Sequence, residues 1–437
     1  MFRSLLVGTT LVLLAAQSGG CQRCPPNAFD CNWPPPPLDA GTDDIKKVIP
    51  PTIPGCVGSC QVDPQCPVGY STKVSGTVTI PAGTLPLPGV QVAIPTGSSL
   101  PLPPGTGPTC APAGSPELST FTTSTDIYGH FDLFDIPSGD NIPLVIRVGK
   151  WQRIITLPKI APCTRTVLPA EQTRLPRNQL EGSIPQLAVS TGGEDALECL
   201  LRSPKLGLDD AEFTAATGTG RVHLYAGASG ANSFTAALGG ASFGAAQPLP
   251  AKSWYDDITN WSKYDAVLLS CEGAEYMNYK SPQALQNMER YLGAGGRVLA
   301  THFHSGWLKN AQPPQTLQSV ATFGASTGPD PVTDTIDLSP NMGGPLASWL
   351  SQDTVLGSTT AGQLLVRRPG YSITGINSDL TQRWISYQPA TGPAVAQVFS
   401  FVAPVGVSPV RQCGRMLFSD IHATSGPSGD SSAAGTP

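Results

Sequence analysis

The segment from Tyr264 to Leu308 constrains the fold more than any other part of this sequence. It holds two short apolar runs, Ala266–Leu269 and Arg297–Ala300, on either side of a helical pattern over Pro282–Leu292. Each run passes at once into polar residues. Buried strands that alternate with a helix predict a mostly parallel, doubly wound α/β sheet. Ligands bind at the carboxyl ends of strands in such sheets, so these polar residues indicate where a site should lie.

The same alternation predicts one α/β domain over residues 188–423. Further helices are expected at 194–202 and 346–350, and further strands at 221–225, 363–366 and 383–387. Ser281 is a suitable cap for the helix that begins at Pro282, and glycines follow its end. A hairpin that pairs 394–402 with 415–421 is expected to extend one edge of the sheet.

Residues 71–168 show a different pattern, with short alternating strands and turn residues between them. Strands are expected at 73–80, 90–94, 119–124, 130–134, 142–148 and 153–157. Six or seven strands in about a hundred residues favour an all-β sandwich. The chain therefore has a multidomain fold, with this β-sandwich followed by the α/β domain.

The sandwich segment contains VSGTVTIPAG, LPGVQVAI, TSTDIYGHFDLFDIPSG and PLVIRVGKW in succession. These motifs resemble those of the carboxypeptidase regulatory-like family, whose fold is also called transthyretin-like or carbohydrate-binding-like. The matching positions of its turn motif are Thr125, Asp126, Gly129, Phe131, Ile136, Pro137 and Gly139. The resemblance implies this fold and does not imply an activity. Gly129 and Asp126 suit a tight turn, so the motif needs no catalytic explanation.

The α/β segment contains Tyr264 and Asp265 before a strand, then RVLATHFHSG, and later GRMLFSDIHA. It resembles the class I glutamine amidotransferase-like superfamily, and within it the ThuA-like proteins, over roughly residues 220–423. Enzymes of that superfamily place a cysteine nucleophile on a sharp turn. This chain has His302, Phe303 and His304 there, which argues against amidotransferase chemistry.

Residues 1–20 read as an export signal, with a positive charge at Arg3, an apolar run and then small residues. Gly20 and Cys21 resemble a bacterial lipobox, which implies a lipid on Cys21 as the membrane anchor. Residues 21–70 are rich in proline and cysteine and predict a tether. Residues 424–437 predict a disordered tail. The expected location is the cell envelope, as an outer-membrane or surface lipoprotein, or secretion if Cys21 is not lipidated.

Of eleven cysteines, setting Cys21 aside leaves ten, an even number that suits disulfides in an exported protein. Their pairing cannot be read from the sequence. Cys271 is expected either to form a disulfide, with Cys199 or Cys413 as partner, or to remain a buried thiol. The spacing of Cys56, Cys60 and Cys66 also fits zinc, but no histidine lies nearby and disulfides are favoured.

Three of the five histidines, His302, His304 and His422, fall at predicted strand ends. On an extended strand His302 and His304 would share a face, and Asp420 has the same relation to His422. With Glu272 nearby, such a set could hold a divalent metal such as zinc and activate water. The alternatives are polar residues that satisfy backbone groups at strand ends, or a nucleophilic Cys271 with a histidine base.

A formal net charge of −5 makes nucleic acid a poor partner. Aromatic residues between Trp254 and Trp307 could stack on a sugar, although core packing is the favoured interpretation of each one. The sequence therefore predicts a non-catalytic envelope protein that binds glycan or peptidoglycan. One alternative is a metal-dependent hydrolase, with the metal held by His302, His304 and His422 and with Glu272 or Asp420 assisting. Another is a purely structural role in surface assembly. The candidate catalytic residues are Cys271, Glu272, His302 and His304, and the candidate metal ligands are His302, His304, Asp420 and His422.

Overall fold

The structure is a computed structural model that describes residues 66–95, 106–110, 121–243, 250–311, 316–339, 343–352, 355 and 362–423. The expected export signal, the lipid-bearing Cys21, most of the tether and the expected disordered tail lie outside these residues. Within the described part of the chain, no helix combines the length and apolar character that a membrane span requires.

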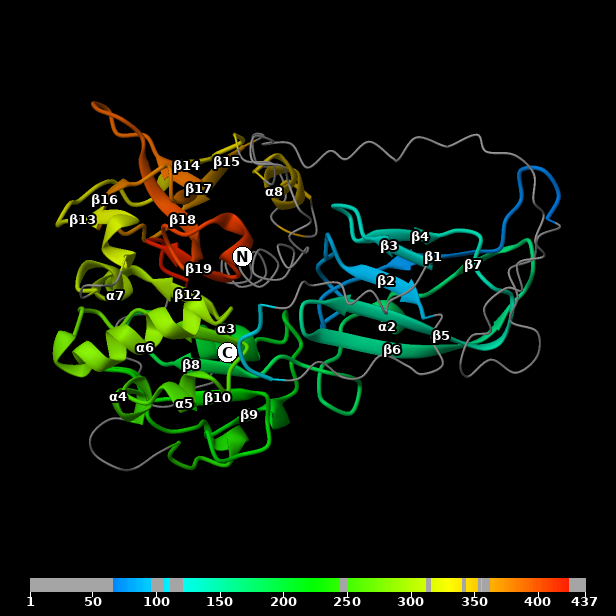
Figure 1. Cartoon of the computed structure of the whole chain (residues 1–437), viewed down its shortest axis with the longest axis horizontal. Helices are drawn as coiled ribbons and strands as arrows, with labels where there is room; N and C mark the ends of the chain where they lie inside the picture. Colours follow the sequence, from blue (N-terminus) through cyan, green and yellow to red (C-terminus); the bar gives the residue numbers. More distant parts are fainter. Residues whose placement is uncertain are drawn as a thin grey trace.

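The N-terminal region is built from two small sheets (Figure 1). One has the order β4-β1-β7 and the other the order β3-β2-β5-β6. The strands are β1 (Lys73–Thr77), β2 (Gln91–Ile94), β3 (Phe121–Ser124), β4 (His130–Leu133), β5 (Gly139–Val148), β6 (Trp151–Ile160) and β7 (Arg165–Val167). All six strands expected from the sequence are therefore present, and β7 is added to them. Their inward side chains, such as Val74, Val92 and Ile146, belong to one hydrophobic core.

The C-terminal region is organised around a ten-stranded sheet of order β15-β14-β17-β18-β19-β12-β11-β8-β10-β9. Its strands are β8 (Leu187–Ser190), β9 (Phe213–Thr214), β10 (Val222–Tyr225), β11 (Ala266–Leu269), β12 (Arg297–Thr301), β14 (Val332–Ile336), β15 (Gln363–Val366), β17 (Thr381–Tyr387), β18 (Val395–Ala403) and β19 (Gly414–Ser419). Strands β13 (Ala321–Phe323) and β16 (Ile373–Ile376) form a separate pair.

This sheet is mixed, so the expectation of a mostly parallel sheet holds for only part of it. The six neighbouring strands β9, β10, β8, β11, β12 and β19 run parallel to one another. From β19 onward each pairing is antiparallel, through β18, β17, β14 and β15. The predicted β18–β19 hairpin is present, but its expected place at the sheet edge is wrong because β12 lies on one side of it and β17 on the other.

Side-chain alternation shows that the parallel strands are buried on both faces. Val267 and Leu269 of β11 belong to one core cluster, whereas Leu268 between them belongs to the other. The first face is covered by α4 (Pro250–Tyr255), α5 (Ile258–Trp261), α6 (Pro282–Gly293) and α7 (Gly306–Lys309). The opposite face packs against α3 (Leu197–Arg202) and α8 (Gly343–Leu350). A short helix, α2 (Ala170–Thr173), follows the N-terminal sheets.

Helix α6 begins where the sequence predicts. The Ser281 hydroxyl accepts a hydrogen bond from the amide of Ala284, at 3.0 Å, and Pro282 occupies the first turn. A proline at this position loses no helical hydrogen bond because the first amides of a helix have no partner within it.

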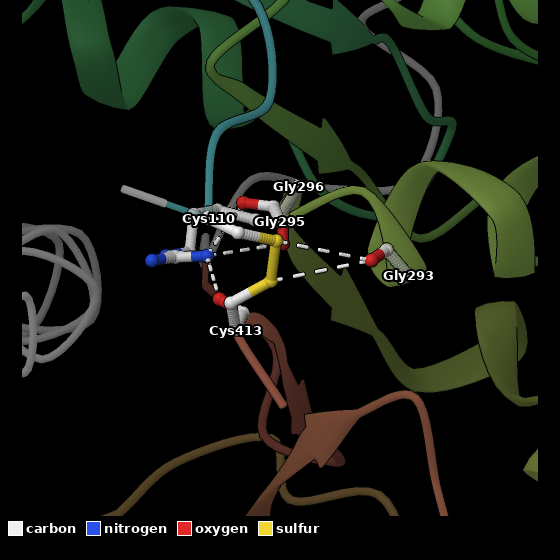
Figure 2. The surroundings of a disulfide bond; sticks show 6 residues. Cys110, Gly293, Gly295, Gly296 and Cys413 are labelled. Carbon is white, nitrogen blue, oxygen red and sulfur yellow. Dashed lines mark hydrogen bonds between the residues drawn. A yellow bond between two sulfur atoms is a disulfide. The ribbon is translucent and has the colours of Figure 1, made fainter. Parts of the chain in front are cut away.

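Several contacts join the two regions. The disulfide between Cys110 and Cys413 is the most direct link, and Figure 2 shows it beside the turn at Gly293, Gly295 and Gly296 that follows α6. Lys150 adds an ion pair with Asp265, whose Oδ1 lies 2.7 Å from Nζ. The indole of Trp349 donates to the carbonyl of Pro86 at 2.8 Å. Core residues of both regions also fall in one cluster, so the regions pack directly on each other.

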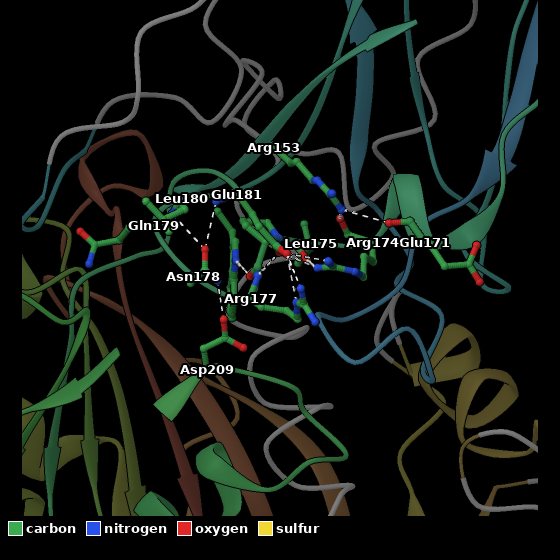
Figure 3. A network of polar contacts seen from close by, with 12 residues as sticks. Arg153, Glu171, Arg174, Leu175, Arg177, Asn178, Gln179, Leu180, Glu181 and Asp209 are labelled. Carbon is green, nitrogen blue, oxygen red and sulfur yellow. Dashed lines mark hydrogen bonds and ion pairs between the residues drawn. The ribbon is translucent and has the colours of Figure 1, made fainter. Parts of the chain in front are cut away.

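The chain between the regions is held by a compact polar network (Figure 3). The carboxylate of Glu181 accepts two hydrogen bonds from Arg174, at 2.6 and 2.7 Å, and others from Arg177. These two arginines hold the pKa of Glu181 far below its usual range. Because bidentate arginine–carboxylate pairs have a fixed planar geometry, the network orients the linker between the regions.

Candidate functional site

The site lies where the carboxyl ends of β8, β11, β12 and β19 meet. After β8 the chain forms β9 and then β10 on one side of it, and later crosses to β11 on the other side. Such a divergence between neighbouring parallel strands leaves a crevice at their carboxyl ends, because the two connections lead away from each other. The residues that follow these strands therefore gather at one edge of the sheet.

Three side chains from three of these strand ends form a cluster: Cys271, His302 and His422. One candidate ligand atom from each lies within 4.8 Å of the others. The Sγ atom of Cys271 is 3.6 Å from Nδ1 of His302, and the rings of His302 and His422 meet edge to face with centroids 4.7 Å apart. Cys271 is fully buried, while the side chains of His302 and His422 are 14% and 10% exposed, so the cluster is open to solvent on its histidine side.

A sharp turn brings His302 into this cluster. Strand β12 ends at Thr301, and His302 begins a 3₁₀ turn over His302–Ser305 with a φ of +39°. Non-glycine residues seldom adopt this left-handed conformation, and those that do concentrate at functional sites. Gly370 packs on the turn, since a Cβ at that position would lie 2.8 Å from Cδ2 of His302. The turn is thus supported from outside the strand.

Each histidine of the cluster also faces a buried carboxylate. Nε2 of His302 lies 3.9 Å from Oδ1 of Asp420, and Nδ1 of His422 lies 3.3 Å from Oδ1 of Asp195 without hydrogen-bond geometry. Both carboxylates are anchored by other groups. Asp195 accepts from the Thr301 hydroxyl at 2.7 Å, and Asp420 accepts from the amide and hydroxyl of Ser372. Carboxylates in this position orient histidine ligands and raise their basicity in metal sites.

Asp420 therefore backs His302 instead of joining the cluster as a ligand, which corrects the expectation from sequence. Its carboxylate accepts three hydrogen bonds in all, the third from the amide of Ile373 at 3.1 Å. The expected pairing of Asp420 with His422 on one strand face fails because strand β19 ends at Ser419.

The predicted pairing of His302 with His304 on one face is wrong. Because the backbone turns after Thr301, His304 points into the protein and is fully buried. Its Nε2 lies 2.8 Å from the carbonyl of Ser270, and its Nδ1 accepts from the indole of Trp307 at 3.0 Å. Burial lowers the pKa of His304 well below the usual value. With both nitrogens used, His304 has a structural role.

Glu272, another predicted site residue, is also engaged elsewhere. It forms a buried ion pair with Lys280, whose Nζ lies 2.6 Å from Oε2, and its Oε1 accepts from the amide of Ala228. Burial raises the pKa of Glu272 and the charge of Lys280 opposes this change. The pair holds the loop after β11 close to helix α7. Nζ of Lys280 lies 5.9 Å from the centroid of the Trp307 ring in that helix.

Cys271 is a buried free thiol, so of the two alternatives expected from sequence the buried thiol is confirmed and the disulfide is not formed. Cys413 is bonded to Cys110 instead, and a second disulfide joins Cys66 to Cys163. Burial, reinforced by the negative charge of Asp195, raises the pKa of the Cys271 thiol, and burial lowers the pKa of His302. A nucleophilic cysteine needs the opposite change, toward thiolate and imidazolium, so this environment disfavours the Cys–His nucleophile.

The cluster has the dimensions of a transition-metal site. Zinc bonds of about 2.3 Å to sulfur and 2.0–2.1 Å to nitrogen place tetrahedral S and N ligands about 3.6 Å apart. The observed Sγ to Nδ1 distance in Cys271 and His302 is the same, 3.6 Å. The ligand atom that His422 offers lies within 4.8 Å of the ligand atoms that Cys271 and His302 offer. A thiolate and two imidazoles are a donor set that zinc and copper favour.

Asp195 is the important site residue that sequence reasoning missed. It belongs to the TGGED segment, which follows the apolar strand β8 just as Cys271 follows β11. Its position after a strand is a signal for the site, but the helical spacing of residues 194–202 assigns Glu194 and Asp195 to the start of a helix.

Four of the six aromatic residues expected mainly to pack do so: Trp254, Tyr255, Trp261 and Trp307 are at most 1% exposed. Tyr276 and Tyr279 are only partly buried. The four buried rings have no surface to offer a ligand. They are not available to stack on a sugar.

Comparisons of this chain with protein families, with curated proteins and with solved structures found no match.

Proposed function

We propose that this protein is a metal-dependent hydrolase with its centre at Cys271, His302 and His422. The observation that carries the proposal is the convergence of these three side chains within 4.8 Å, at the carboxyl ends of parallel strands. Three protein ligands leave the fourth position of a tetrahedral ion to water, which is the arrangement of catalytic zinc sites. A bound zinc ion supplies a water whose pKa is near 7.

The surrounding residues support the same proposal. Asp420 and Asp195 would orient His302 and His422, and their negative charges would offset the charge of the ion. The parallel strand order β10-β8-β11-β12-β19 also supports the proposed resemblance to flavodoxin-like and amidotransferase-like sheets, in which ligands bind at this edge. The residue at the sharp turn is a histidine, which suits metal binding and not thioester chemistry.

The direct test is the metal content of untagged protein purified from an exporting host, measured by mass spectrometry. We expect about one equivalent of zinc or another transition metal, lost in His302→Ala and in His422→Ala. His130→Ala is the matched control because that histidine is 63% exposed in the N-terminal region. Hydrolysis of p-nitrophenyl acetate should stop after chelation and return with zinc. Wild-type protein without metal, or metal retained in both site variants, would refute the proposal.

A second candidate function is glycan binding by the N-terminal sheets. The supporting observation is an exposed aromatic face on and beside β4, where Tyr128 is 50% and Phe134 is 54% exposed. Tyr128 stacks with His130, and Nζ of Lys73 lies 4.2 Å above the Phe134 ring. Aromatic rings beside charged groups suit the apolar face and hydroxyls of a sugar.

Sedimentation with insoluble peptidoglycan tests this candidate. The Tyr128→Ala, Phe134→Ala double variant should remain in solution, whereas Leu180→Ala, at a 97% exposed residue elsewhere, should sediment like the wild type. Equal sedimentation of all three proteins would refute binding by this face.

We further infer that the protein works in an oxidising compartment such as the cell envelope. The disulfides Cys66–Cys163 and Cys110–Cys413 support this proposal, because such bonds are rare in reducing cytosol. The export signal and lipid on Cys21 remain proposals from sequence, tested by mass spectrometry of the mature N-terminus.

A further inference from the structure

Arg368 lies at the rim of the candidate metal centre, and its backbone is fixed to the end of β19. The carbonyl of Arg368 accepts from the amide of His422 at 3.3 Å, and the amide of Gly370 donates to the carbonyl of Asp420 at 2.6 Å. Arg368 itself has a φ of +54°. These contacts hold residues 368–370 beside His422 and beside Asp420, whose carboxylate faces His302.

The side chain of Arg368 reaches the other side of the centre. Its Nη2 lies 2.9 Å from Oε2 of Glu194, the residue before Asp195. Glu194 also adjoins the Cys271 strand end, because its amide donates to the Cys271 carbonyl at 3.0 Å. The Arg368 and Glu194 side chains are 31% and 28% exposed, whereas the cluster beneath them is nearly buried. The ion pair therefore lies on the solvent side of the cluster.

We propose that Arg368 anchors the carboxylate of an anionic substrate at this centre, and that Glu194 holds its place when no substrate is bound. This inference rests on the proposed metal centre and specifies its substrate class. The guanidinium presents a planar fork that matches a carboxylate. The carboxylate of Glu194 already contacts one nitrogen of this fork. A carboxylate bound there would lie at the rim of the cluster formed by Cys271, His302 and His422, which would hold the ion.

The charges around the site favour a singly charged ligand. A divalent ion, the Cys271 thiolate and the carboxylates of Asp195 and Asp420 together carry one net negative charge. Arg368 offsets this charge, and the Glu194 carboxylate adds one negative charge at its guanidinium. A ligand carboxylate that takes the place of Glu194 therefore leaves the local charge unchanged, whereas a dianion such as phosphate would add a further negative charge to a partly buried site.

The test uses the full-length protein loaded with cobalt(II), whose visible spectrum changes when an anion enters the centre. Acetate is the probe, and inorganic phosphate is the comparison. We expect acetate to perturb the spectrum in a saturable way. The Arg368→Gln substitution should raise the Kd for acetate at least tenfold. Arg367→Gln is the matched control, since Arg367 is the exposed neighbour on the same segment and should change the Kd less than twofold.

Glu194→Gln makes the sharper prediction. Removing the resident carboxylate should tighten acetate binding severalfold, although the substitution adds no contact to the ligand. Tighter binding of phosphate than of acetate would overturn the carboxylate assignment. Equal effects of the two arginine variants, or weaker binding in Glu194→Gln, would overturn the role of Arg368. Failure of the wild type to bind cobalt would instead overturn the metal centre itself, and this inference with it.

Discussion

The Sγ atom of Cys271 lies 3.6 Å from Nδ1 of His302, although the two residues are 31 positions apart in the chain. Strands β11 and β12 are parallel neighbours in register, with Leu269 opposite Ala300, so the residues that follow them emerge side by side. Strand β19 brings Asp420 and His422 to the same edge through its pairing with β12. The site is therefore a direct consequence of parallel strand pairing.

His302 and His304 should separate cleanly in mutagenesis. His302→Ala should lose the metal and keep a stable fold. His304→Ala should keep the metal and lose about 2 to 4 kcal/mol of unfolding free energy, because Ser270 and Trp307 lose their buried hydrogen-bond partner. Metal analysis combined with urea unfolding measures both effects. Loss of metal without loss of stability in His304→Ala would contradict the assigned roles.

The carboxylates behind the histidines should tune metal affinity. Asp195→Asn and Asp420→Asn should each weaken zinc binding by roughly 10- to 100-fold, since such partners orient and polarise the ligands. Competition with a chromophoric chelator measures the affinity. Asp132→Asn, a surface change on β4, serves as the control and should leave zinc affinity as it is. Unchanged affinity in both site variants would show that the carboxylates only support the backbone.

The buried Lys280–Glu272 pair predicts a non-additive pair of substitutions. Lys280→Met leaves the Glu272 carboxylate buried without its counter-ion, at a cost of about 3 to 5 kcal/mol in unfolding free energy. The double variant Lys280→Met, Glu272→Gln should recover a large part of this loss because no unpaired charge remains. Chemical denaturation of these two variants and of Glu272→Gln completes a double-mutant cycle with the wild type. Simple addition of the two single effects would exclude direct coupling.

Asp334 predicts a defined dependence of stability on pH. It is fully buried on β14, and neither carboxylate oxygen has a hydrogen-bond partner within the described part of the chain. Burial raises its pKa to about 7. An unfolded chain releases this proton near pH 3.9, whereas the folded protein retains it up to about pH 7. The unfolding free energy therefore falls as pH rises through this window, and the loss is complete above it.

Asp334→Asn should remove this pH-dependent loss. Relative to the wild type, the variant should gain stability between pH 4 and pH 8, by up to roughly 4 kcal/mol. Thermal or urea unfolding at several pH values measures the difference. Asp140→Asn changes an exposed residue of β5 and is the control. Its unfolding free energy should differ from that of the wild type by the same amount at every pH. A constant difference between Asp334→Asn and the wild type would show that Asp334 is ionised in the folded state.

Local sequence patterns were sufficient for the elements that depend on neighbouring residues. The start of α6 follows from the hydroxyl of Ser281 and the fixed φ of Pro282, and β11 follows from an apolar run that ends at Leu269. Polar residues after these runs also indicated the correct edge of the sheet. Such signals are readable because propensity, capping and burial act over a few residues.

Only the tertiary structure decided which of those polar residues meet. His304 leaves the site because the backbone turns at His302, and Cys413 bonds to Cys110 because the two regions pack together. Asp195 and Arg368 lie 173 positions apart in the chain. Strand order brings Asp195 to the site, and a loop packed on the end of β19 brings Arg368 there. Sequence alone thus determined the elements and the edge where chemistry is expected. The ligands, their supporting carboxylates and the disulfides depended on long-range packing, which no local pattern encodes.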